Sequence, residues 1–227
     1  MVNTSFQPIS QTWKRLDNWA EKYFLEGFCL TNPPATNLDV QSVQAEYNVE
    51  LPSSFLASLK IHNGSQFGGL PFPHMQSLSC SEIINSINLW KGPPKAVGPD
   101  STFLNLYPHI KDAKAARKRW EAIQKRQWEK TTGRLLAKGK HFERNIHAVK
   151  VHKCIQPCFW NLRWIEIASN DYSSLYIDCD PTEFGNIGQV IQVIYEDGEY
   201  SLVSKSYEEL LANVAEELEN GNYPSFV

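Results

Sequence analysis

Apolar residues recur at helical spacing in the first 90 residues of the chain. This pattern predicts a helix over residues 11–25, a second over 38–47 and a third that begins at Leu51-Pro52. A fourth begins near Ser79 and Glu82, because a serine followed three residues later by glutamate is typical of a capping box. The N-terminal part is therefore predicted to be helical.

From Ile146 onward the spacing becomes that of β-strands, followed by one more helix. The predicted strands contain Val149 and Val151, Trp164–Ile167, Leu175–Ile177, Val190–Tyr195 and Tyr200–Ser204. Asp197-Gly198 is typical of a hairpin turn between the last two. Ser206 and Glu209 resemble a second capping box, before a helix that ends near Gly221. This order predicts an α+β fold, with N-terminal helices packed on an antiparallel sheet and a C-terminal helix.

Charge is distributed unevenly along the chain. Residues 111–153 hold 14 Lys and Arg against 4 Asp and Glu, a local charge of +10, whereas the remainder carries −13. Residues 110–130 have helical spacing and are predicted to form a basic helix. An acidic body attracts basic partners. The basic segment could instead bind an acidic surface, or fold back on its own domain.

Composition limits the class of protein further. The 227 residues suffice for one large domain, or for a domain with an insertion. No run of 18 apolar residues is present and the N-terminus lacks a signal-peptide pattern, so neither a membrane span nor secretion is predicted. The five cysteines are irregularly spaced, which favours reduced thiols and a cytoplasmic protein over a disulfide framework.

The order of several short motifs resembles the SUKH superfamily, which includes fungal cell-wall assembly regulators and bacterial toxin-immunity proteins. The similarity covers roughly residues 11–98 and 145–223, within a single domain over 1–227, and residues 103–145 look like a basic helical insertion. The matching motifs are Leu51-Pro52 with Phe55 and Leu59, Asn63-Gly64, Trp164-Ile165, Asp178 with Asp180-Pro181, Gly188-Gln189-Val190-Ile191, and the final helix over 206–218.

The resemblance implies a non-enzymatic protein-binding module without a cofactor. Its first interpretation is an immunity protein that covers the cationic cleft of a toxin domain with an acidic face. We expect that face to contain Asp171, Asp178, Asp180 and Glu183. The alternative is a regulatory scaffold in cell-wall assembly or signalling. The resemblance also implies that Trp164 is a core residue.

A third hypothesis is nucleic-acid binding through residues 111–130. Basic side chains would neutralise phosphates and an indole would stack on bases. The candidates are Arg117, Lys118, Trp120 and Arg126, which could equally contact a protein or belong to a solvated helix. Nucleic acid is the less favoured partner.

The remaining clusters favour structural roles. Asp178-Cys179-Asp180 resembles part of a metal site but lacks a third ligand. The spacing of His147, His152, Cys154 and Cys158 matches no common zinc pattern, so no metal is predicted. Gly185–Gly188 is predicted to be a tight turn rather than a phosphate loop. No serine or cysteine has the surroundings of a known nucleophile motif, so no catalytic residue is predicted.

Overall fold

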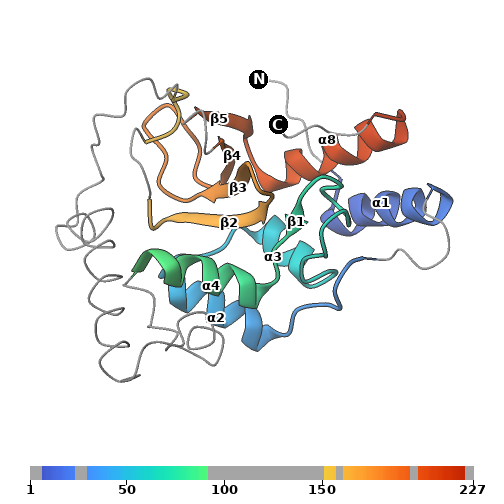
Figure 1. Cartoon of the computed structure of the whole chain (residues 1–227), viewed down its shortest axis with the longest axis horizontal. Coiled ribbons are helices and arrows are strands. Elements are labelled where there is room, and N and C mark those ends of the chain that lie inside the picture. The colour runs from blue at the N-terminus through green and yellow to red at the C-terminus, as the bar shows by residue number, and fades with distance from the viewer. Residues whose placement is uncertain (1–6, 24–29, 92–150, 157–160, 195–198, 223–227) are drawn as a thin grey trace, which may run out of the picture.

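An antiparallel sheet with its strands in sequence order organises the chain (Figure 1). The computed structural model describes residues 7–23, 30–91, 151–156, 161–194 and 199–222. Its five-stranded sheet has the order β1-β2-β3-β4-β5, and each described neighbouring pair is antiparallel. The strands are β1 (Gln76–Ser77), β2 (Trp164–Ser169), β3 (Ser173–Asp178), β4 (Gln189–Ile194) and β5 (Glu199–Ser204).

The helices form two pairs on one side of this sheet. In Figure 1, α1 lies beside α8, while α2 lies beside α4 below β2. The short α3 contacts both α1 and α8. The helix bounds are α1 (Ile9–Tyr23), α2 (Asn37–Tyr47), α3 (Ser53–Leu59), α4 (Cys80–Lys91) and α8 (Tyr207–Glu219).

Local side-chain bonds fix where these helices begin. The Ser79 backbone N–H donates to Glu82 (2.8 Å) and the Glu82 N–H donates to the Ser79 hydroxyl (3.4 Å), so the predicted capping box of α4 is confirmed. At α8, Ser206 accepts from the Glu209 N–H (3.2 Å), but the Glu209 carboxylate accepts from the backbone of Lys205. Only the serine half of the second predicted box therefore forms, because the Glu209 carboxylate bonds Lys205 in place of the Ser206 N–H.

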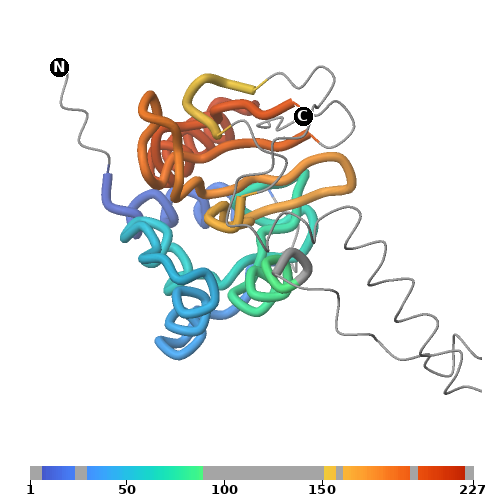
Figure 2. The backbone as a smooth tube through the Cα atoms, turned by 90° about the vertical axis from the view of Figure 1, so that its left-hand side faces the viewer, coloured from blue at the N-terminus to red at the C-terminus, as the bar shows by residue number. Residues whose placement is uncertain are grey.

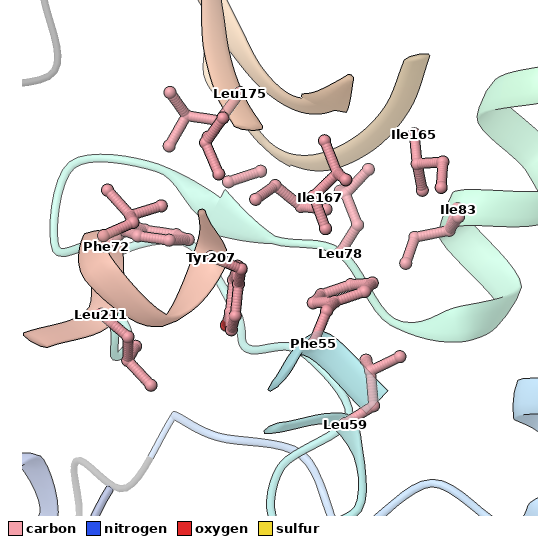
Figure 3. Close-up of a cluster of buried hydrophobic side chains, with 14 of the residues drawn as sticks. Phe55, Leu59, Phe72, Leu78, Ile83, Ile165, Ile167, Leu175, Tyr207 and Leu211 are labelled. Carbon is pink, nitrogen blue, oxygen red and sulfur yellow. The ribbon is translucent and has the colours of Figure 1, made fainter. Parts of the chain in front are cut away.

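The helix-facing side of the sheet contains the larger core. Ile165, Ile167 and Leu175 point from the sheet toward Phe55 and Tyr207, as Figure 3 shows. These side chains are at most 4% exposed. The Phe55 and Tyr207 rings meet edge to face, with their centroids 5.0 Å apart. Burial of this apolar area is the main favourable term that holds helices to sheet.

The opposite side of the sheet holds a second, smaller core. Trp164 is fully buried there, which confirms its predicted burial, and its ring lies edge-on to Tyr200 at 5.6 Å. Tyr176 and Ile191 lie beside it, and Ile155 covers them from the segment before β2. Every residue of β3 is consequently buried, because both faces of that strand are covered.

The Asn63-Gly64 motif joins α3 to the start of α4. The Asn63 side chain accepts from the Cys80 backbone N–H (2.8 Å) at the N-terminus of α4. Gly64 has a φ of 76°, and a Cβ placed there would lie 2.6 Å from the Ser77 carbonyl oxygen. Only glycine fits this close approach, so the motif has a structural role.

The fold class is confirmed, and most predicted elements lie within about two residues of those observed. Two details differ. The two-residue β1 was not predicted. Val151, predicted to lie in a strand, forms only an isolated bridge with Tyr200. Val149, the turn at Asp197-Gly198, the basic helix over 110–130 and the insertion over 103–145 lie outside the described residues.

Candidate interaction surface

The connection between β3 and β4, residues 179–188, is built around the buried carboxylate of Asp178. This side chain is fully buried and accepts hydrogen bonds from the Asp180 backbone N–H and from Gln189 Nε2, each at 2.9 Å. Burial raises the pKa of the Asp178 carboxyl above its usual value, and these hydrogen bonds oppose that shift. Asp178 therefore supports the loop from inside.

Gln189 completes the support from the first position of β4. Its Nε2 also donates to the Cys154 carbonyl oxygen (2.9 Å), and its Oε1 accepts from the Asn186 backbone N–H (3.1 Å). Gly185 lies so close that an added Cβ would meet the Cys154 oxygen at 2.6 Å. One buried amide thus bonds β3, the loop and the segment containing Cys154, so their relative positions are fixed.

The same segment, residues 151–156, holds the loop along its length. Thr182 donates through its backbone N–H to the Cys154 oxygen (3.2 Å) and through its hydroxyl to the Lys153 oxygen (2.7 Å). The Cys154 thiol donates to the Phe184 oxygen (2.9 Å). Gln156 Nε2 donates to the Pro181 oxygen (3.1 Å). The loop backbone is therefore ordered by contacts that leave its outer side chains free to point into solvent.

Two large apolar side chains lie on the outside of this ordered loop. Phe184 is 64% exposed and Ile187 is 79% exposed. Glu183 is exposed beside them, and the half-buried Asp180 accepts from Asn161 Nδ2 at 3.0 Å. We call Asp180, Glu183, Phe184 and Ile187 the loop platform. Its combination of apolar anchors and carboxylates suits a protein partner.

The four carboxylates predicted for partner binding do not form one surface. Asp180 and Glu183 share the loop platform. Asp178 is buried, so its predicted place on an accessible face is wrong; its carboxylate instead accepts hydrogen bonds from the Asp180 N–H and Gln189 in the interior. Asp171 is exposed in the β2–β3 turn, at the opposite end of β3. Six strand residues separate the two ends, about 20 Å.

The alternative set, Arg117, Lys118, Trp120 and Arg126, lies outside the described residues. Within the described ranges no group of three or more His, Cys, Asp or Glu side chains could hold a metal ion. Those ranges also contain no helix long and apolar enough to cross a membrane.

Phe184, Ile187 and Gln189 were not singled out as site residues from the sequence. The signal for the first two was present, since two large apolar residues fall in a turn between Pro181 and Gly188. Gln189 could not be recognised, because its bond to Cys154 joins positions 35 residues apart.

The thiols of Cys80 and Cys179 are not activated nucleophiles. Burial raises the pKa of Cys80 to about 11 and that of Cys179 to about 12. Both thiols therefore stay protonated near neutral pH, whereas the reactive form of cysteine is the thiolate.

The amino-acid sequence is similar to several known proteins. The model of the SMI1 / KNR4 family (SUKH-1) matches residues 34–213. "Cell wall biosynthesis/cell cycle regulator smi1" of Schizosaccharomyces pombe is 27% identical over 220 residues, covering 95% of this chain and 37% of that protein. "Glucan synthesis regulatory protein" of Neurospora crassa is 24% identical over 219 residues, covering 95% of this chain and 39% of that protein. This chain thus spans less than half the length of either relative.

Proposed function

Because the chain belongs to the SMI1 / KNR4 family (SUKH-1), we propose that it is a protein-binding regulator acting in cell-wall glucan synthesis. Two fungal relatives are named as regulators of cell-wall biosynthesis and of glucan synthesis. Those names support the regulatory alternative better than toxin immunity. This chain matches only 37% and 39% of the length of these two relatives. Their named role is therefore proposed for this chain on the strength of the matching part.

The observation that carries protein binding is the loop platform. Phe184 and Ile187 are displayed on a backbone that Gln189, Asp178 and Cys154 already hold in place. A preformed loop loses little conformational entropy on binding, and exposed apolar side chains gain from leaving water. Such a loop is suited to contact a partner without rearrangement.

The names of the relatives as regulators support a non-enzymatic role, and so does the polar bonding around the loop. The buried polar side chains near the loop bond one another and the backbone, as Asp178 and Gln189 do. We infer that the chain acts by binding.

The nucleic-acid hypothesis has less support than protein binding. The described residues hold 8 Lys and Arg against 17 Asp and Glu, a net charge of −9. An acidic body repels phosphates. The basic residues 111–130 lie outside the described ranges, so nucleic-acid binding through them stays a prediction.

A chimaeric protein tests the proposal. The matching portion of the Schizosaccharomyces pombe regulator is replaced by this chain, and incorporation of labelled glucose into wall glucan is measured. We expect the chimaera to support normal glucan synthesis, and the same chimaera with Phe184→Asp and Ile187→Asp to lose that support. Tyr172→Asp, at the opposite end of β3, is the matched control because Tyr172 is 63% exposed. Full activity of the loop variant would overturn the assignment of this surface.

A further inference from the structure

Besides the loop platform, the surface has a shallow hollow formed by α2 and the turn that follows it. Its lining comes from one outward stripe of α2 and from the turn that follows, and its volume is about 580 Å³. The buried stripe of the helix, Val40, Val43 and Tyr47, faces the core instead. The hollow is lined by Gln41, Gln44, Ala45, Asn48, Val49 and Glu50.

The hollow and the loop platform are connected through a contact between Gly188 and Pro52. Gly188 packs on Pro52, since a Cβ added at Gly188 would lie 3.2 Å from Pro52 Cγ. Ile187 precedes Gly188, and Glu50 stands two residues before Pro52. Figure 2 shows the orange β3–β4 connection above the cyan and blue segments of α3 and α2. A ligand that contacts Ile187 can therefore continue across Pro52 into the hollow.

The chemistry of this surface changes from one end to the other. Phe184 and Ile187 offer apolar contact at the loop end. Gln41, Gln44 and Asn48 offer amide groups at the α2 end, and each side-chain amide can both donate to and accept from a peptide backbone. Glu50 lines the hollow, and Glu183 belongs to the loop platform. Both side chains are exposed, and neither forms an ion pair with another described residue.

We propose that this connected surface docks an extended basic segment of a partner protein. An apolar side chain of that segment packs on Phe184 and Ile187, lysine or arginine side chains pair with Glu50 and Glu183, and its backbone bonds the amides of α2. The inference rests on the proposed function and adds to it the class of partner.

Size and charge both favour this occupant. The stripe from Gln41 to Asn48 is about 10 Å long. A segment extended at about 3.3 Å per residue covers this stripe with about three residues, and further residues reach the turn and the loop. The exposed carboxylates of Glu50 and Glu183 give this surface a local negative charge, which attracts a basic segment. The same charge disfavours a nucleic acid, and it disfavours a second copy that would place carboxylates against carboxylates.

Selection of random displayed peptides of about 12 residues on the full immobilised chain tests this proposal. The selected peptides are synthesised, and their affinities are measured by calorimetry for the parent chain and its variants. We expect peptides that combine Lys or Arg with an aliphatic or aromatic residue. Glu50→Lys with Glu183→Lys should weaken binding about 10-fold, because two attractions become repulsions. Asp171→Lys with Glu217→Lys is the matched control, with the same charge change at exposed positions elsewhere, and should change affinity less than about 2-fold.

The outcomes separate this inference from the function on which it rests. Loss of affinity in Phe184→Ser with Ile187→Ser, but not in the Glu50 and Glu183 variant, would overturn the basic segment and leave the loop platform standing. Affinity unchanged in both variants would overturn the loop platform itself. Selection of acidic or neutral peptides, or of none, would also overturn the proposed partner. Equal melting temperatures of all variants establish that each one is folded.

Discussion

At the scale of single residues, Asp178 shapes the loop platform without being part of it. Its carboxylate bonds the Asp180 backbone and Gln189 below the exposed side chains. In the sequence, Asp178 and Asp180 stand near the end of a strand and suggest an exposed turn. In the structure Asp178 is buried. Residues 151–156, which are distant in sequence, pack against this turn through the bond from Gln189 to Cys154.

Replacing Asp178 by alanine should cost stability. Gln189 and the Asp180 N–H would lose a buried acceptor, which typically costs about 1–3 kcal/mol. Asp171→Ala is the control at an exposed position and should change the free energy of unfolding by less than about 0.5 kcal/mol. Urea denaturation at neutral pH measures both. Equal stability of the two variants would show that the carboxylate does not support the loop.

The raised pKa of Asp178 gives this residue a signed pH dependence. A carboxyl whose pKa is higher in the folded state binds more protons when folded, so its contribution to stability improves as the pH falls through that folded pKa. We therefore expect the parent chain to gain stability relative to Asp178→Asn as the pH is lowered from 7 toward 4. Denaturation of both proteins across this range measures the difference. A relative loss on acidification would mean that the folded state favours the charged carboxylate.

Trp164 is the largest of the fully buried side chains. Trp164→Ala should lower the free energy of unfolding by about 3–5 kcal/mol, through lost contacts and the cavity left behind. Tyr172→Ala, which removes an aromatic ring that is 63% exposed, should cost less than about 0.5 kcal/mol. Chemical denaturation distinguishes the two. A cost under about 1 kcal/mol for the tryptophan variant would mean that the second core contributes little.

At the scale of elements, the packing of α1 on its neighbours depends on one buried hydroxyl. Ser58 of α3 accepts from Trp13 Nε1 of α1 (2.8 Å) and bonds the Tyr207 hydroxyl of α8 (2.9 Å). Arg15 and Glu219 also join α1 to α8, at 2.6 Å, but both side chains are partly exposed. Solvent weakens an exposed ion pair, so the hydroxyl should matter more.

Ser58→Ala should therefore cost about 1–3 kcal/mol, because it leaves the Trp13 N–H without an acceptor in the interior. Glu219→Gln should cost only about 0–1 kcal/mol. Thermal and urea unfolding of the two variants give the comparison. If the ion-pair variant proved the less stable one, the surface contact would be the stronger link between these helices.

Sequence periodicity predicted the helices and long strands because each buries a repeating stripe or face. Ser79 with Glu82 even located the start of α4. Periodicity could not find β1, whose two residues hold no repeat. It also could not reveal the loop platform as an ordered surface, because order there comes from Cys154 and Gln156 bonding residues 25 to 35 positions away. Local pattern and tertiary contact thus determine different parts of the molecule.

At the scale of the whole molecule, the sheet and the segment 151–156 hold the loop platform in place on the surface. We propose above all that a protein partner contacts this platform. The most direct measurement is photo-crosslinking in Schizosaccharomyces pombe cells that carry the chimaera, with benzoylphenylalanine placed at Phe184 or, as a control, at Tyr172. Both positions are more than 60% exposed, so neither replacement should disturb the core. We expect benzoylphenylalanine at position 184 to form a covalent adduct with a protein, and the same residue at position 172 to form none. Adducts from position 172 alone, or from neither position, would contradict this proposal.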